Sequence, residues 1–328
     1  MPWIFGVSDV AIAKQREELT TISRTTKPQC TAVESSLSPS LCVFTLGALR
    51  IFRDGVEIEP SVWVRQKART LCACLLSARP QRVHKEELME LLWPSVDPGR
   101  ADRLLQVTLS DLRAVLGGGS RQAGRRFVSR VGHHYGLEVG SSGWSDVEEF
   151  EAEYEAGVRA EKAGDATRAM RHLVAAEALY AGDFLVEERL ASWASNRRER
   201  LRDRCIDALR RLARMHETAG EIREAVTYTK KLVSIDPYLE PYYRDLMRFQ
   251  HSLGDHGGVV QTYLRCRDAM REGLDSDMAL ETRSLAERLL GASFDEVVAR
   301  HARARRRAMH ASLIVAPRWM AGTLGTRT

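Results

Sequence analysis

The sequence contains no long hydrophobic run. No stretch of about 18 apolar residues occurs in it, so a membrane-spanning helix is excluded and no membrane partner is expected. The opening residues, MPWIFGVSDVAIAKQREEL, have no basic segment ahead of their short apolar stretch, which argues against an export signal. We therefore expect a cytoplasmic protein.

Cysteine is scarce, and its spacing matches no metal or redox motif. The chain has neither a C-x-x-C pair nor a zinc-ligand spacing. Free, buried thiols are the expectation, with neither disulfides nor a metal site. The six cysteines are Cys30, Cys42, Cys72, Cys74, Cys205 and Cys266.

Motifs of the common enzyme classes are absent. The chain lacks H-E-x-x-H, G-x-S-x-G and the paired glycines of dinucleotide sites. It also lacks a phosphate-binding loop, because the run GGGS at 117–120 has no lysine that could reach a phosphate. Paired acids such as Glu86 and Glu87 stand at predicted helix starts, where they suit the helix dipole. We expect neither an enzyme nor a cofactor.

The net charge of +5 is unevenly distributed along the chain. Residues 41–140 hold 15 Lys and Arg against 10 Asp and Glu, whereas residues 141–296 hold 23 against 30. A basic module joined to an acidic one fits a polyanion-binding domain beside a domain that stays off the polyanion. Residues 297–328 hold 7 basic and no acidic side chains, and this tail is either a nucleic-acid clamp or a solubilising end.

The first hundred residues after the leader mix two periodicities. Residues 1–40 have no apolar period and predict a disordered leader. From Leu41, alternating apolar residues around the Asp54-Gly55 turn predict two or three short antiparallel strands. Helical patterns follow within 65–80, 84–93 and 101–117, and FVSRVGHHYGLEV predicts a terminal hairpin. The segment VDPGRADR, residues 96–103, predicts a turn.

From Trp144 onward the pattern is helical almost without a break. Gly220 and Ala225, and Gly164 and Ala169, stand five residues apart as in a tetratricopeptide unit, and Gly254 follows Gly220 by the period of 34. Three imperfect copies predict an α-solenoid, with an ordinary helical bundle as the alternative. A long helix after Ala191 has one apolar face and an arginine-covered face, which we interpret as solvated.

This ordered set of strings resembles the Streptomyces antibiotic regulatory protein family. The strings are LGALRIFRDG, ELLWP, the L-x-x-L-R of 109–113, the GHHYGLEV hairpin and ALYAGDFL. The resemblance covers roughly residues 41 to 290. It implies an α+β winged helix-turn-helix domain at 41–140, followed by an all-α tetratricopeptide-like solenoid at 144–291, the bacterial transcriptional activator domain.

The resemblance also implies a function. Members of the family are expected to activate transcription by binding direct repeats in duplex DNA near promoters and by contacting RNA polymerase. Direct repeats imply self-association on DNA through head-to-tail contacts. Candidate contact residues for this association are Tyr228, Tyr242 and Tyr243, with a ring packed in the core as the alternative for each.

The third predicted helix is the candidate DNA-reading element. Its core face is formed by Leu105, Leu109, Leu112 and Leu116, and the opposite face would enter the major groove. Residues that can pair with bases or phosphates or touch a thymine methyl group lie on or beside that face. The face carries Arg103, Val107, Ser110, Asp111 and Ala114, and it is flanked by Gln106 and Arg113. By the resemblance, the basic or polar residues expected near the DNA backbone are Arg65, Lys67, Arg69, Lys85, Arg121, Arg125, Arg126, Arg130 and His133.

Asp111 departs from the family pattern, which usually has a basic residue at this position. An acid facing the groove must accept from a cytosine amino group, pair with a neighbour such as Arg103 or Arg113, or weaken binding. The alternative function is therefore an adaptor that does not bind DNA and uses the helical repeats to hold a partner protein. His133 and His134 are adjacent on a predicted strand, so they should point to opposite faces and not share a metal.

Overall fold

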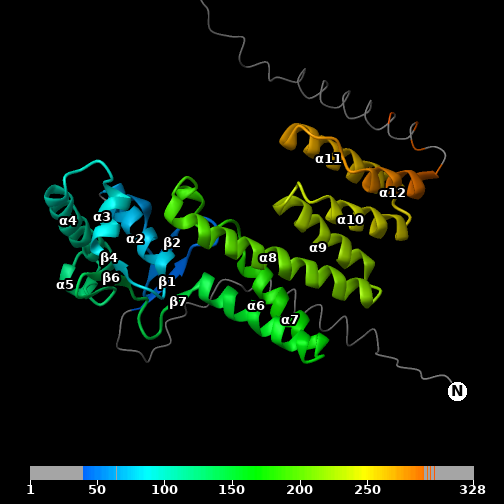
Figure 1. Cartoon of the computed structure of the whole chain (residues 1–328). Helices are drawn as coiled ribbons and strands as arrows, with labels where there is room; N and C mark the ends of the chain where they lie inside the picture. The colour runs from blue at the N-terminus through cyan, green and yellow to red at the C-terminus, as the bar shows by residue number, and fades with distance from the viewer. Residues whose placement is uncertain (1–39, 64, 292–293, 295, 297–298, 300–328) are drawn as a thin grey trace, which may run out of the picture. The chain divides into compact units, whose positions relative to one another are not determined.

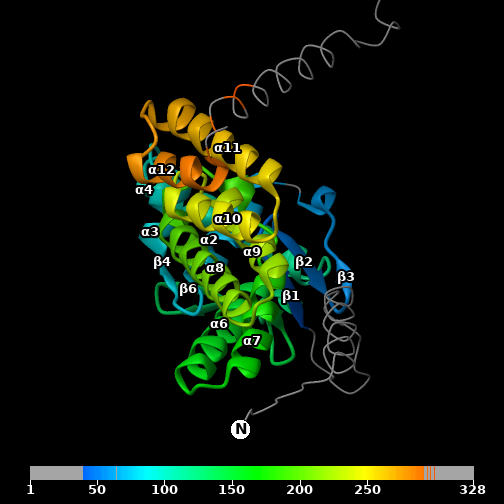
Figure 2. The same cartoon turned by 90° about the vertical axis from the view of Figure 1, so that its right-hand side faces the viewer.

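The computed structural model describes residues 40–63, 65–291, 294, 296 and 299. The predicted disordered leader and the predicted basic tail lie outside the described residues, apart from Ser40 and Ala299. The chain divides into two compact units, Met1–Ala208 and Leu209–Thr328, and the division falls inside one long helix. Each unit is described by itself below (Figures 1 and 2).

The first unit begins with a four-stranded sheet. The strands are β1 (Leu41–Phe44), β2 (Arg50–Arg53), β3 (Val56–Glu57) and β7 (Trp144–Ser145), in the order β3-β2-β1-β7. The predicted turn at Asp54-Gly55 joins β2 to β3. Both residues have positive φ, a conformation that an Asp-Gly pair adopts readily in a two-residue hairpin turn. Strand β7 pairs parallel to β1, so a segment about a hundred residues later completes this sheet.

Helices follow the sheet as predicted, and a second small sheet follows the helices. The helices are η1 (Pro60–Val62), α2 (Gln66–Ala78), α3 (Lys85–Leu92), α4 (Pro98–Leu116) and α5 (Arg121–Gly124). The second sheet contains β4 (Val83–His84), β5 (Val128–Val131) and β6 (His134–Leu137), in the order β4-β6-β5. The predicted hairpin is therefore present, and the short strand β4 that extends it was not predicted.

Helix α4 begins earlier than the sequence indicated. The segment VDPGRADR at 96–103 was expected to form a turn, but Asp97 caps the helix by accepting a hydrogen bond from the Arg100 amide at 3.1 Å. Pro98 occupies the first helical turn, where its missing amide proton costs nothing. The Asp-Pro pair is thus a helix start, and it adds a turn to α4.

The rest of the described chain is helical. It comprises α6 (Asp146–Lys162), α7 (Ala166–Leu179), η2 (Val186–Glu188), α8 (Ser192–Thr218), α9 (Ile222–Ile235), α10 (Glu240–Ser252), α11 (His256–Leu274) and α12 (Leu280–Leu290). Figures 1 and 2 both show α6 beside α7, and α10 beside α11. None of the helices in the described part of the chain is long and apolar enough to cross a bilayer.

Three helix pairs are joined by the same turn. Gly164, Gly220 and Gly254 have φ values of +79°, +77° and +72°, which glycine adopts without the strain of a Cβ. In each turn the glycine amide bonds to the carbonyl three residues back, and the next amide bonds five residues back. The residue five positions after each glycine is fully buried: these residues are Ala169, Ala225 and Val259. The predicted glycine register therefore marks real helix pairs.

The second unit encloses most of its aromatic side chains. Tyr243 packs with Ala225, Leu246 and Phe249, is fully buried, and donates a hydrogen bond to the Pro237 carbonyl at 3.0 Å. Its selection as a self-association contact was therefore wrong, because the ring belongs to the core.

Two further expectations need correction. Arg197, on the arginine-covered face of α8, is not solvated: its guanidinium donates to the carbonyls of Ser77 and Arg79, and burial lowers its pKa. Cys42 is disulfide-bonded although no disulfide was expected. The absence of a C-x-x-C motif excludes only local pairs, whereas a disulfide needs only spatial proximity. The other described cysteines, Cys72, Cys74, Cys205 and Cys266, form no disulfide and are buried, as expected.

A buried carboxylate links the first sheet to the helical segment. Asp146, the first residue of α6, accepts hydrogen bonds from the amides of Thr45 and Leu46 at 2.6 and 2.7 Å, and from the Thr45 hydroxyl at 3.0 Å. Burial raises its pKa, and the donated hydrogen bonds oppose that shift. Leu46 also bridges to Phe184 of the ALYAGDFL string, so this string packs against the sheet.

We predict that Asp146→Asn destabilises the first unit by about 1–3 kcal/mol, because the neutral side chain keeps only one acceptor oxygen and turns an NH2 donor either toward the amides of Thr45 and Leu46 or toward the amide of Val147. Hydrogen exchange at the Thr45 and Leu46 amides, read by mass spectrometry, should accelerate. Glu149→Gln removes an exposed charge from the same helical turn and serves as the control. Equal exchange in both variants would contradict the assignment of Asp146 as the link.

Candidate nucleic-acid interface

Helix α4 separates a buried face from an exposed one. Leu105, Leu109, Leu112 and Leu116 are all fully buried, which confirms the predicted core face. On the other side Arg103 and Gln106 are exposed, and Val107 retains 45% of its surface. Ser110 is half-buried beside them. The helix therefore presents a short surface with a cation, an amide and an apolar side chain, which is the mixture that reads base edges.

Asp111 has a partner, and it is neither Arg103 nor Arg113. Its carboxylate forms an ion pair of 2.7 Å with Arg65, the residue that precedes α2. Because both groups are partly exposed, the pair contributes little to stability, but it neutralises the acid on this surface. The unfavourable charge inferred from the sequence is thus compensated by a residue from another helix.

Arg113 is turned toward the protein. Its guanidinium is half-buried, one nitrogen donates weakly to the Val128 carbonyl at 3.4 Å, and burial lowers its pKa. Val128 begins β5, so Arg113 connects the end of α4 to the hairpin. This geometry makes Arg113 a structural link rather than a freely extended phosphate ligand.

A polar chain connects α3, α4 and β6. Lys85 pairs with Asp102 at 3.0 Å, and this lysine holds the pKa of Asp102 below its usual value. Gln106 donates to the hydroxyl of Tyr135, a fully buried ring on β6, at 3.4 Å. The position of Gln106 therefore depends on the hairpin as well as on α4.

The two predicted contacts at the start of α2 are engaged inside the unit. Lys67 donates to the Leu92 carbonyl at 2.7 Å, which ties α2 to the end of α3. Arg69 donates to the Leu49 carbonyl at 3.2 Å and pairs with Glu187 at 2.9 Å. Arg69 thus faces the junction between the sheet and η2.

The hairpin presents exposed basic and polar side chains. Arg126, Arg130 and His133 are all exposed. The Arg130 side chain donates to the Gly132 carbonyl at 2.8 Å, and its guanidinium lies 5.6 Å from the centre of the Tyr135 ring. This contact fixes the arginine at the turn of the hairpin.

His133 lies in the turn and not on the strand, so the expected opposite orientation of His133 and His134 was wrong. Both rings approach His84 on β4, with centroid distances of 6.0 and 5.0 Å. Within the described ranges, no group of three or more His, Cys, Asp or Glu side chains is arranged to hold a metal ion.

Sequence reasoning missed Asp102 and Tyr135, the partners that hold Lys85 and Gln106. Asp102 stands four residues before Gln106 on one helix, and this spacing could have indicated their proximity. Tyr135 is 29 residues from Gln106, and no local signal reveals that contact.

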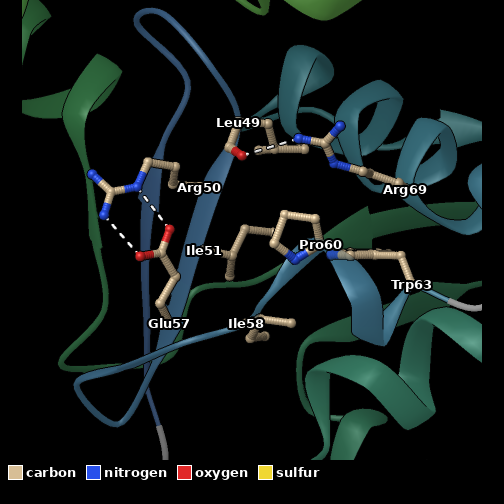
Figure 3. Close-up of a pocket in the computed structure, with 8 residues that line it drawn as sticks. All are labelled: Leu49, Arg50, Ile51, Glu57, Ile58, Pro60, Trp63 and Arg69. Atoms are coloured by element: carbon tan, nitrogen blue, oxygen red, sulfur yellow. Dashed lines mark hydrogen bonds and ion pairs between the residues drawn. The ribbon is translucent and has the colours of Figure 1, made fainter.

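The described part of the first unit also has a small hollow beside β2 and β3 (Figure 3). Its volume is about 90 Å³, below the range of about 300–1,000 Å³ that small-molecule sites occupy. In Figure 3 the Arg50–Glu57 pair lies to one side of the hollow and Pro60 and Trp63 to the other. This hollow suits a single side chain and does not resemble an active site.

The chain is similar to known transcriptional regulators. Residues 145–290 match the bacterial transcriptional activator domain. Transcriptional regulatory protein MoaR1 of Mycobacterium tuberculosis is 25% identical over 79% of this chain and 83% of its own length. Transcriptional regulatory protein EmbR of the same species is 26% identical over 75% of this chain, which spans 62% of EmbR.

A solved structure has a related fold. EmbR of Mycobacterium tuberculosis, in complex with a low-affinity phosphopeptide, aligns with a TM-score of 0.60 and 25% identity over 81% of this chain and 70% of its own. These matches confirm the resemblance to the Streptomyces antibiotic regulatory protein family. They are to proteins named as regulators and not to enzymes, and they support a role in transcription regulation.

We predict that Gly124→Ala disturbs the connection between α4 and the hairpin. A Cβ at this position would lie 1.9 Å from the Arg113 carbonyl oxygen, so the backbone of α5 must move away. Overpacking of this kind costs about 1–3 kcal/mol. Urea unfolding should show the loss, whereas Gln122→Ala, an exposed neighbour on α5, should have little effect. Equal free energies of unfolding in the two variants would contradict the prediction, because they would show that α5 can move away from Arg113 without destabilising the unit.

Proposed function

We propose that this protein is a sequence-specific, DNA-binding transcriptional activator. Residues 41–140 would be a winged helix-turn-helix domain, with α4 as the recognition helix and the β5–β6 hairpin as the wing. Residues 144–291 would be the tetratricopeptide-like activator domain, between a leader at 1–40 and a basic tail at 297–328. The order of strands, three helices and hairpin supports this division, as does the match of residues 145–290.

The exposed face of α4 is the observation that carries the proposal. Arg103, Gln106 and Val107 stand clear of the core on a helix whose opposite face is fully buried. Within the described part of the chain, the side chain of Arg103 forms no hydrogen bond or ion pair with another residue. Arginine can bind guanine or phosphate, glutamine can bind adenine, and valine can contact a thymine methyl group. Such a face fits the major groove.

The surroundings of α4 supply cations for the DNA backbone. Arg126, Arg130 and His133 extend from the wing, where they would lie near phosphates or the minor groove. Lys67 and Lys85 lie at the starts of α2 and α3, and each is bonded within the unit, to the Leu92 carbonyl and to Asp102 respectively. Arg69 and Arg113 are also engaged within the unit and would hold the framework.

The structure weakens the main argument for the adaptor alternative. That alternative was favoured by Asp111, an acid expected on the DNA-facing surface. The ion pair with Arg65 neutralises this acid, so the repulsion it would exert on phosphates is reduced. We therefore keep DNA binding as the proposed function.

Activation, binding to direct repeats and contact with RNA polymerase are proposed from the resemblance and from the similarity to named regulators. The helix pairs of the activator domain would provide the protein-binding surface, because repeats of this kind expose side chains that the core does not consume.

The first test is retention of the full chain on duplex DNA at low salt. Binding should weaken steeply as salt rises, because phosphate contacts release counterions. Retention that is absent, or that does not respond to salt, would favour the adaptor function.

Two substitutions, one on α4 and one between α5 and β5, test the docking geometry. Gln106→Ala should cost about 1–3 kcal/mol on a selected site and relax one base position, because it removes a base contact. Arg126→Ala should weaken binding to specific and random DNA alike, because it removes a phosphate contact. It should also reduce the slope of log affinity against log salt concentration by about one. Gel-shift titrations of both variants at several salt concentrations separate the two effects. Unchanged titrations for both would exclude this docking.

Cooperative pairing is tested by the number of half-sites. Two copies in a head-to-tail arrangement on tandem repeats should bind a double site more tightly than two independent half-sites would. The affinities for one and two half-sites are compared at one salt concentration. Equal affinity per site would exclude self-association on DNA.

A further inference from the structure

A groove of about 400 Å³ runs between α10 and α12 in the second unit. Three arginines line it, together with an acid, a serine and two leucines. They are Arg244, Arg248, Arg288, Glu281, Ser284, Leu280 and Leu285. The segment that contains this groove has an acidic balance, so the cluster of guanidinium groups is a local exception to its surroundings.

The arginines differ in how firmly they are held. Arg244 donates to the Thr282 hydroxyl at 3.0 Å, and that hydroxyl donates to Glu240 at 2.5 Å, which fixes the guanidinium at the side of the groove. Arg248 is 54% exposed and pairs with Asp245 at 2.6 Å. Arg288 is exposed at the other side, on α12. Cations thus face the groove from both helices.

The groove also has an apolar component. Leu280 is 77% exposed, whereas Leu285 is buried in the floor. Glu281 is the acid nearest to Arg244, at 3.7 Å, and its own side chain is 81% exposed. A competing carboxylate could therefore replace this loose pair without breaking a buried contact.

We propose that this groove binds an acidic peptide segment that carries a leucine or a similar apolar residue among its carboxylates. The carboxylates would pair with Arg248 and Arg288, for which planar, bidentate hydrogen bonding is favourable. The apolar residue would cover Leu280, which water now surrounds. A DNA backbone would satisfy the arginines and leave this leucine uncovered, so the mixed chemistry favours a peptide.

This inference names the chemistry of a partner protein for the activator domain, and to that extent it rests on the proposed function. The test uses the full chain and a fluorescent peptide of about twelve residues, with Asp, Glu and Leu in helical spacing. A second peptide, with Asn and Gln in place of the acids, is the control ligand. Fluorescence anisotropy measures both.

The variants are matched in charge. The groove variant is Arg248→Glu with Arg288→Glu, and the control is Arg223→Glu with Arg265→Glu, two exposed arginines on α9 and α11 that do not line the groove. The groove variant should bind the acidic peptide at least about tenfold more weakly than the wild-type chain does, and the control variant less than about threefold more weakly. Leu280→Ser should weaken peptide binding several-fold, although it leaves the charge of the groove unchanged.

Several outcomes would overturn the proposal. Equal weakening by both charge variants would show a response to net charge alone. Equal binding of the neutral peptide would exclude recognition of carboxylates. Displacement of the peptide by random duplex DNA would assign the groove to nucleic acid, and weakened self-association of the groove variant in sedimentation would assign it to a second copy. If the wild-type chain binds the peptide through the groove and fails to bind DNA, the proposed function fails and the groove remains.

Discussion

The carboxylate of Asp146 is the interaction on which the first unit depends. It begins α6 and accepts hydrogen bonds from the amides of Thr45 and Leu46, about a hundred residues earlier in the chain. Those amides lie just after β1 and donate to the Asp146 carboxylate, which accepts the hydrogen bonds that a neighbouring strand would otherwise accept. Because Leu46 also bridges to Phe184, the first strand, the first activator-domain helices and the ALYAGDFL string form one cooperative structure. The connection at residues 140–144 is consequently a structural joint rather than a loose linker.

The same joint holds residues near the surface that is proposed to face DNA. Arg69 was expected beside the phosphates, but it pairs with Glu187 of η2 and so belongs to the joint. Arg197 of α8 donates to carbonyls at the end of α2 in the same way. Helix α2 is therefore held by Glu187 of η2 and Arg197 of α8, whereas Arg65, the residue before it, pairs with Asp111 of α4.

The parts of the structure that follow from local patterns could be predicted. The buried face of α4 follows from leucines at helical spacing, and the three helix turns follow from glycines that must adopt a positive φ. The side-chain contacts within the candidate site could not be predicted from the sequence. Asp111 meets Arg65 across 46 residues, and Gln106 meets Tyr135 across 29, because tertiary packing and not periodicity brings them together. His133 was misplaced for a related reason: one residue of register decides whether a side chain lies on a strand or in its turn.

The ion pair between Asp111 and Arg65 shows how an acid can persist on a surface proposed to bind a polyanion. An isolated carboxylate there would repel phosphates, whereas a pair of 2.7 Å presents a nearly neutral dipole. Because the pair is partly exposed, it would be able to exchange partners in the proposed DNA complex, with Arg65 bonded to a phosphate and Asp111 accepting from a cytosine amino group. Such an exchange would make the fit depend on the base opposite Asp111. A residue that lowers the affinity for random DNA would then increase the difference between the correct site and all others, which is the quantity that specificity measures.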